Sequence, residues 1–144
     1  MQIEDFFQTV NDTNIAELVP QFYREDIQFR DPLVALQGRE ALIVYYQKLF
    51  AGVDAVQIVF GEHLETGDSH MIAWTLTLRA GRLNNGNPFH LDGISHIKYA
   101  GGLVYYHREY FDLSVVLFEK LPVIGGLMGW LKKQNRPDLS WQTV

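Results

Sequence analysis

Residues 22–38 read FYREDIQFRDPLVALQG and contain the feature from which the rest of the chain can be interpreted. A short extended segment flanked by aromatic residues ends at Asp31, and a helical pattern begins at Gly38. Because proline disfavours the α region for the residue before it, Pro32 holds Asp31 extended. Two interpretations of Asp31 stay open: a proton-transfer group in an apolar pocket, or a turn residue whose carboxylate caps nearby amides.

The residues on either side of this stretch predict three helices. The first covers Ile3–Val10, and the second follows Asn14, which precedes Glu17 by three residues as in a capping pair. The third opens at Gly38 and closes at Gly52. Its apolar residues recur at helical spacing and form a stripe wide enough to cover a sheet: Leu42, Tyr45, Tyr46, Leu49 and Phe50.

From residue 56 onward the apolar pattern changes to a period of two, which is typical of strands. The alternating segments are Val56–Phe60, Ile72–Leu78, Phe89–Tyr99 and Leu103–Leu113. The segment Asn84–Asn87 is a strong hairpin signal, and Gly93 indicates a strand irregularity such as a bulge. Helices followed by hairpin-connected strands predict an α+β fold whose antiparallel sheet is covered on one side.

Length and composition narrow the class of protein. With 144 residues, the chain is expected to form a single domain over residues 1–144. A net charge of −5 with scattered basic residues argues against nucleic-acid binding. The lack of cysteine excludes disulfides, thiol nucleophiles and thiolate metal sites. Because neither a secretory signal nor a transmembrane run of about 18 residues is visible, a soluble cytoplasmic protein is expected.

With this order of elements, the chain resembles the nuclear transport factor 2-like superfamily, which includes SnoaL-like polyketide cyclases and ketosteroid isomerases. The resemblance covers roughly residues 3–113 and is carried by three segments: Tyr23–Gly38, Ile72–Leu78, and Gly93–Tyr99 with His107–Asp112. It implies a cone in which a strongly curved, mostly antiparallel sheet wraps around the N-terminal helices, with a pocket at the wide end. It also implies a homodimer.

In the ketosteroid isomerases, an Asp-Pro at this position supplies the general base, and Asp31 matches it. The resemblance therefore implies a catalytic role for Asp31. The family's oxyanion hole of a tyrosine and a protonated aspartic acid falls on Phe7 and Ser95 here. Phenylalanine has no hydrogen to donate, and losing one oxyanion donor costs on the order of 100-fold in rate. Steroid isomerase activity is therefore rejected.

The same resemblance implies which side chains face the pocket. It points Trp74, Leu76, Ser95, Ile97, His107, Glu109 and Phe111 inward, and Phe7, Tyr23 and Tyr46 are added as ligand-binding candidates. His107 and Glu109 are two residues apart on a strand and share a face, so they are candidates for an acid and a base opposite Asp31. The alternative is a hydrogen-bonded histidine beside a solvated glutamate. Helical spacing alone explains the tyrosines as core residues with exposed tips.

Residues 121–135 form an apolar segment with a basic end, and a helix is expected there. Since its apolar part is short and its basic residues are few, membrane anchoring is the least favoured of its roles. We expect a lid or a packing role. The other histidines, 63, 70, 90 and 96, show no metal-ligand spacing, so neither a metal nor another cofactor is predicted.

Two functional hypotheses follow. The first is an isomerase, cyclase or hydratase-like enzyme for a small, mostly apolar, carbonyl-containing compound, with Asp31 as base and His107 or Ser95 stabilising the oxyanion. The second is a non-catalytic domain of the same fold that binds an apolar ligand or forms a dimer through its exposed sheet face. It predicts that backbone amides bond to Asp31.

Overall fold

The computed structural model describes residues 1–81 and 86–114. Its elements follow the chain in the order α1 (Ile3–Thr9), α2 (Ile15–Phe22), β1 (Tyr23–Arg30), β2 (Ala35–Gln37), α3 (Arg39–Phe50), β3 (Ala55–Thr66), β4 (Ser69–Arg79), β5 (Phe89–Ala100) and β6 (Leu103–Phe111). The three helices and the later strands lie where the sequence predicts them, and the α+β class is confirmed.

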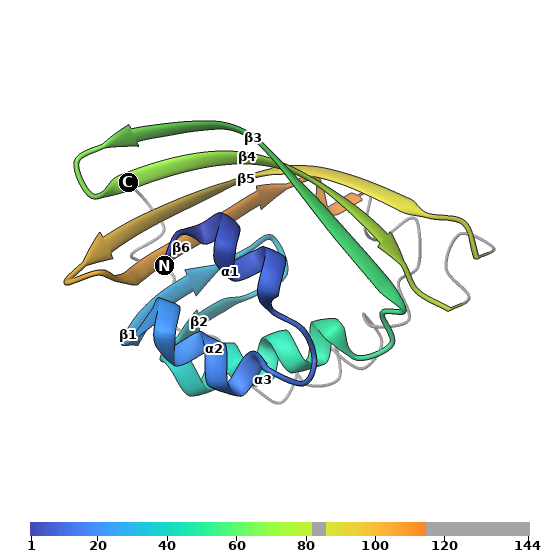
Figure 1. Cartoon of the computed structure of the whole chain (residues 1–144), viewed down its shortest axis with the longest axis horizontal. Coiled ribbons are helices and arrows are strands. Elements are labelled where there is room, and N and C mark those ends of the chain that lie inside the picture. The colour runs from blue at the N-terminus through green and yellow to red at the C-terminus, as the bar shows by residue number, and fades with distance from the viewer. Residues whose placement is uncertain (82–85, 115–144) are drawn as a thin grey trace.

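The six strands form one sheet in the order β2-β1-β6-β5-β4-β3. Every neighbouring pair is antiparallel except β1 and β6, which run parallel. The sheet curves over the three helices, which lie on its concave side (Figure 1). The expected curved, mostly antiparallel sheet around N-terminal helices is therefore confirmed.

The turn between β2 and α3 sets the position of the third helix. Gly38 has a φ of 95°, a left-handed value that favours glycine over residues with a Cβ. Its N–H donates to the carbonyl of Ile27 at 2.8 Å, and its carbonyl accepts the N–H of Leu42 in the first helical turn. The chain thus leaves β2 and enters α3 with Leu42, Tyr45 and Tyr46 buried.

Two local expectations differ from the structure. Asn14 precedes α2, but its side chain makes no capping bond and instead accepts the N–H of Asn11 and donates to the carbonyl of Thr9. Gly93 is not in a bulge, because it pairs in regular register with Trp74 and Phe111. A Cβ at Gly93 would overlap the benzo ring of the Trp74 indole, so the glycine allows close side-chain packing instead.

The expected hairpin tip at residues 84–87 falls largely outside the described residues, and the expected helix at 121–135 falls wholly outside them. The strands on either side of the tip, β4 and β5, do pair antiparallel. Among the described residues, no helix combines the length and the apolar character needed to span a bilayer.

The buried apolar residues form two groups. The larger lies among the helices and the β1 side of the sheet and includes Phe6, Phe22 and Ile97. The smaller consists of Trp74, Phe89 and Leu91 on β4 and β5. The candidate site lies between these two groups.

Candidate functional site

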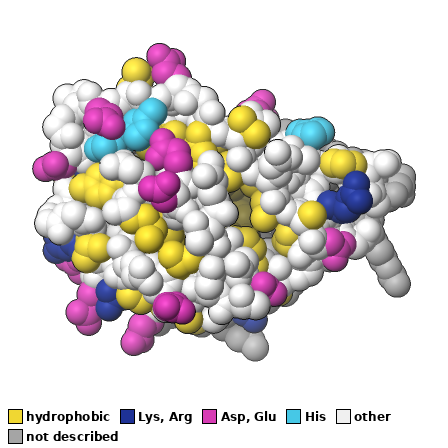
Figure 2. All heavy atoms as spheres, viewed as in Figure 1, with side chains coloured by type: hydrophobic (Ala, Val, Ile, Leu, Met, Phe, Trp, Pro, Cys, Tyr) yellow, Lys and Arg dark blue, Asp and Glu magenta, His cyan; other side chains and the backbone are white. Residues whose placement is uncertain are grey.

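A cavity of about 220 Å³ lies between α3 and the sheet. Most of its lining side chains are apolar and come from α3, from β3 to β6 and from the chain that follows β1. Its polar groups belong to Asp31, Tyr45, Tyr46, Trp74, Ser95 and Glu109. Figure 2 shows a hollow edged by hydrophobic side chains near the middle of the face in view. An apolar cavity with a few converging polar groups is typical of small-molecule sites.

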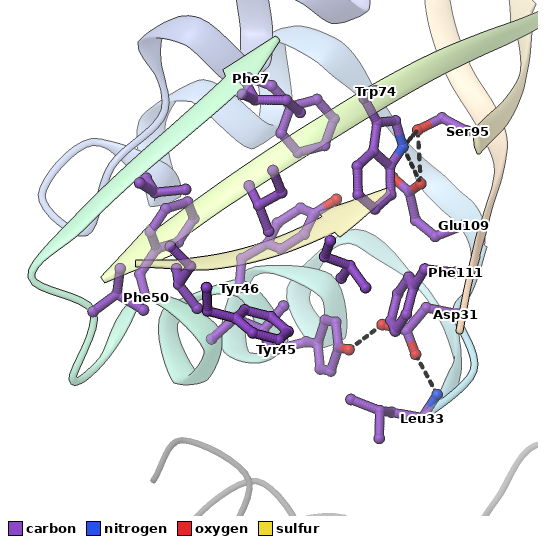
Figure 3. Close-up of a pocket in the computed structure, with 18 of the residues that line it drawn as sticks. Phe7, Asp31, Leu33, Tyr45, Tyr46, Phe50, Trp74, Ser95, Glu109 and Phe111 are labelled. Carbon is purple, nitrogen blue, oxygen red and sulfur yellow. Dashed lines mark hydrogen bonds between the residues drawn. The ribbon is translucent and has the colours of Figure 1, made fainter. Parts of the chain in front are cut away.

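One wall of the cavity holds Asp31, which is 7% exposed. Its Oδ1 accepts the backbone N–H of Leu33 at 2.7 Å and of Val34 at 2.9 Å. Its Oδ2 accepts the hydroxyl of Tyr45 from α3 (Figure 3). Because Pro32 has no N–H, the first amide available to the carboxylate is that of Leu33. The local chain therefore holds Asp31 as a turn residue, while α3 holds it against the cavity.

The pKa of Asp31 depends on two opposing features of its surroundings, burial and hydrogen bonding. Burial raises its pKa from 3.8 to about 6, although the hydrogen bonds from Tyr45, Leu33 and Val34 lower it. The charge of Glu109 adds a smaller rise. A carboxylate accepts about four hydrogen bonds, and the described residues donate three to Asp31. One acceptor position and a pKa near neutrality suit a general base.

The same wall holds Glu109, on the strand beside β1, and its side chain is 12% exposed. Its Oε1 accepts from Nε2 of His107 at 2.6 Å. Its Oε2 accepts the hydroxyl of Ser95 at 2.7 Å and the indole N–H of Trp74 at 3.1 Å (Figure 3). The indole N–H also lies 3.0 Å from the Ser95 oxygen. Three strands, β4, β5 and β6, thus contribute to the position of one carboxylate.

A chain of hydrogen bonds continues behind this wall. Nδ1 of His107 lies 2.7 Å from the hydroxyl of Tyr23, which lies 3.0 Å from the hydroxyl of Tyr46. Burial raises the pKa of Tyr23 and of Tyr46 well above 10, so both remain neutral hydroxyls. When Nε2 of His107 donates to the Glu109 carboxylate, Nδ1 of the ring accepts the hydroxyl of Tyr23. Since Tyr46 and Glu109 both line the cavity, the chain begins and ends there.

The site residues suggested by the sequence divide into two groups. Those that line the cavity are Phe7, Asp31, Tyr46, Trp74, Leu76, Ser95, Glu109 and Phe111. Tyr23, Ile97 and His107 are wholly buried and are not among the lining residues. Ile97 belongs to the larger core group, while Tyr23 and His107 form hydrogen bonds to the lining residues Tyr46 and Glu109.

Two side-chain expectations need correction. The hydroxyls of Tyr23, Tyr45 and Tyr46 do not reach solvent, because these residues are at most 5% exposed and their hydroxyls bond to buried partners. Glu109 is not a solvated glutamate beside His107, because donors from three strands surround it.

Sequence reasoning omitted Tyr45, which donates to Asp31, and several apolar lining residues. Leu49 and Phe50 extend the helical stripe of α3, and Val56 and Ile58 lie on the alternating face of β3. Their periodicity was a usable signal, since residues on one face share an environment. The Tyr45 contact joins residues 14 apart in the chain, and no local pattern indicates it.

The side chains close enough to share a metal ion are not at the cavity. Within the part of the chain that the structure describes, the one such group is His63, Glu65 and His70, on the β3–β4 hairpin.

The chain is similar in sequence to one protein family and similar in fold to many solved structures. The model of the SnoaL-like domain family matches residues 3–107. No curated protein sequence matches the chain.

Solved structures with the same fold share little sequence with the chain. TerC co-crystallised with polyporic acid is 14% identical, with a TM-score of 0.68 over 81% of this chain and 93% of TerC. A protein with a ketosteroid isomerase-like fold from Catenulispora acidiphila, in complex with trimethylamine, is 20% identical, with a TM-score of 0.65 over 77% and 85% of the two chains. An LEH-like epoxide hydrolase from M. tuberculosis is 14% identical, with a TM-score of 0.65 over 92% and 93%.

These neighbours share the curved sheet and its helices with this chain, and the family model covers the residues from α1 to His107 on β6. The chain therefore belongs to the SnoaL-like domain family, within the nuclear transport factor 2-like fold.

Proposed function

We propose that the cavity binds a small, mostly apolar, carbonyl-containing compound and that Asp31 transfers a proton to and from the carbon next to the carbonyl. The observation that carries this proposal is the buried, cavity-facing Asp31 carboxylate with a pKa of about 6. General bases work best when their pKa lies near the working pH.

The chemistry follows from Asp31 and from Tyr46, which lies on α3. Asp31 takes the proton from carbon, and the electrons of that C–H bond shift to the carbonyl oxygen. Because Tyr23 donates to His107, the hydroxyl of Tyr46 donates to Tyr23 before a ligand binds, and it exchanges this bond for one to the oxyanion. Asp31 then returns the proton to the same carbon or to another. Since His107 has no contact with the cavity, it acts as a positioning residue for Glu109.

Cavity size and lining limit the ligand. A dry cavity of about 150 Å³ is enough to bind benzene, so about 220 Å³ accommodates a compound of one or two rings. The neighbours of the same fold that were crystallised with polyporic acid and with trimethylamine support a small organic ligand. The family's range, which includes cyclases, isomerases and epoxide hydrolases, is compatible with proton transfer at such a site.

Exchange of α-protons for deuterium tests this proposal with simple ketones in place of the natural substrate. Cyclohexenone, tetralone and acetophenone are incubated with the protein in D₂O, and loss of the α-proton signal is followed by NMR. We expect exchange with at least one ketone, slowed about 100- to 10,000-fold in Asp31→Asn. Asp26→Asn, an exposed position on β1, serves as the matched control and should exchange at the wild-type rate. Equal exchange in wild type and Asp31→Asn contradicts the proposal.

A second candidate function is a dimeric, non-catalytic domain. Two observations favour it: amides of the local turn already bond to Asp31, and the convex face of the sheet is partly apolar. Of the eight large hydrophobic side chains exposed among the described residues, five lie on that face: Val59, Leu64, Met71, Ile94 and Tyr110. Such a patch is typical of protein interfaces.

Sedimentation equilibrium tests the dimer. We expect a homodimer in the wild-type chain and a monomer in Ile94→Asp, because a charge at the centre of the patch must be desolvated on association. Val44→Asp, an exposed position on α3, is the control. A wild-type chain that is monomeric at high micromolar concentration contradicts the dimer proposal.

A further inference from the structure

The β3–β4 hairpin brings together three side chains with metal-binding groups. His63 and Glu65 are two residues apart on β3, and Glu65 pairs directly across from His70 on β4. A register shift between Phe60 and His63 changes which residues of β3 face inward. Before it, Phe60 pairs with Trp74 on the concave side; after it, His63 pairs with Ile72 on the same side. Such bulges re-aim side chains and are common beside functional sites.

The ligand atoms of these residues are close to one another. Nε2 of His63 lies 2.9 Å from Nδ1 of His70, and these two nitrogens lie 3.4 and 3.5 Å from Oε1 of Glu65. Tetrahedral zinc with bonds of about 2.0–2.1 Å places its ligand atoms about 3.3–3.4 Å apart. Two of the three separations already match, and the two nitrogens need to part by about 0.4 Å.

Glu4 supplies the support that metal-bound histidines usually have. Its Oε1 lies 2.8 Å from Nδ1 of His63, so this nitrogen donates to the carboxylate and leaves the Nε2 lone pair facing His70 and Glu65. A carboxylate behind a histidine fixes the tautomer that binds metal. Glu4 lies in the first turn of α1, so the cluster joins this helix to the hairpin. In Figure 2, histidine and acidic side chains gather over this region.

We propose that His63, Glu65 and His70 bind a divalent transition-metal ion, with Glu4 orienting His63. Two imidazoles and one carboxylate suit zinc and, in the same arrangement, ferrous iron. Without an ion, only one of the two facing ring nitrogens can donate to the other, and Glu65 lies beyond hydrogen-bond range of both. A cation between them satisfies all three lone pairs.

Within the cluster, His70 is the most buried side chain and Glu65 is the most exposed, so the metal site would be open to water on the Glu65 side. The side chain of His70 is 11% exposed and its ring packs on Tyr99 with centroids 5.0 Å apart, whereas Glu65 is 60% exposed. The histidines are thus held in place while the carboxylate side stays open to water, which can supply a fourth ligand. Because Glu4 and His63 join α1 to the sheet, the ion stabilises the attachment of the helix that also carries Phe7.

The test is titration of the full chain, without a polyhistidine tag and after chelator treatment, with Zn²⁺ in a calorimeter. We expect one ion per chain and a higher melting temperature with zinc. Binding at this stoichiometry should be lost in the His63→Ala, His70→Ala double variant. Glu4→Gln should weaken binding by about 10- to 100-fold. His90→Ala, an exposed histidine of β5, is the matched control and should bind as wild type does.

Glu65→Gln keeps the test valid if the double variant does not fold, because this exposed side chain can change with little effect on the fold. It should weaken zinc binding with an unchanged circular dichroism spectrum. The proposal is overturned if the wild-type chain takes up no zinc in stoichiometric amount, or if Glu65→Gln and Glu4→Gln bind zinc as tightly as wild type. Ketone exchange at the cavity is measured separately, so failure of one proposal does not decide the other.

Discussion

The two carboxylates of the cavity are held in different ways. Asp31 receives two of its three hydrogen bonds from amides two and three residues further along the chain. Glu109 receives bonds from Ser95, Trp74 and His107, which lie on three strands. The position of Asp31 is thus largely a local property of the Asp-Pro turn, whereas the position of Glu109 depends on the assembled sheet.

This difference indicates what each residue contributes. A carboxylate held by its own turn can change protonation with little effect on distant elements, which suits a proton-transfer group. Removing a carboxylate that accepts hydrogen bonds from several strands lowers the stability of the fold, because donors lose their partner. We therefore expect Asp31 to dominate the pH dependence and Glu109 to dominate stability.

The largest expected effect is on Glu109. Glu109→Leu leaves Ser95 and His107 without an acceptor and leaves the Trp74 indole N–H with Ser95 alone. We expect a loss of about 3–5 kcal/mol in the free energy of unfolding, measured with urea. Glu25→Leu, an exposed glutamate on β1, is the control and should change stability by less than about 0.5 kcal/mol. A loss below about 1 kcal/mol in Glu109→Leu removes the contrast between the two carboxylates.

The second effect is the pH dependence that Asp31 contributes. Because its pKa is 3.8 ordinarily and about 6 in the folded chain, the folded state holds this proton more tightly. Asp31 therefore contributes its full share to the stability of the folded state below about pH 4. This contribution is lost as the pH rises through about 6. The rise in pKa corresponds to about 3 kcal/mol.

Urea unfolding of wild type and Asp31→Asn at several pH values isolates this contribution. The difference between their unfolding free energies should shift against wild type by about 2 kcal/mol between pH 4 and pH 6, and by about 3 kcal/mol between pH 3 and pH 7. A difference that does not vary with pH contradicts the raised pKa. A shift in the opposite direction indicates that the hydrogen bonds from the amides and from Tyr45 lower the pKa of Asp31 by more than burial raises it.

A smaller effect tests the packing beside Glu109. A methyl group at Gly93 would overlap the Trp74 ring, so Gly93→Ala must displace the indole whose N–H donates to Glu109. We expect a loss of about 1–3 kcal/mol and a shift of the Trp74 indole N–H signal in NMR spectra. Gly61→Ala is the matched control, since a Cβ there meets Ala73 only at 3.5 Å. Equal behaviour of the two variants argues against close packing of Trp74 on β5.

The smallest effect concerns the one non-local bond of Asp31. Tyr45→Phe removes a donor that lowers the pKa of this carboxyl, so the pKa should rise above about 6 at a cost of about 1 kcal/mol in stability. NMR titration of the Asp31 carboxyl measures the change. Tyr46→Phe is the control, because its hydroxyl bonds to Tyr23 instead. An unchanged titration in Tyr45→Phe indicates that the local turn alone sets the pKa.

The helices and most strands could be predicted because each rests on a short-range pattern. Leu42 and Tyr46 recur at helical spacing, Ile72 and Trp74 alternate, and both patterns correspond to buried faces in the structure. The bulge of β3 could not be predicted in this way. The alternation of Val56, Ile58 and Phe60 does not reveal that the inward face then passes to His63.

By itself, the sequence determined the α+β class, the Asp31 turn and the apolar character of the site, because these depend on neighbours within a few residues. Only the tertiary structure decided that Tyr45 reaches Asp31 and that Glu109 is partly buried and hydrogen-bonded rather than solvated. It also brought His63, Glu65 and His70 together. The reason is physical: burial and hydrogen bonding depend on which strands and helices meet, and strand register and bulges are set by packing across the whole sheet.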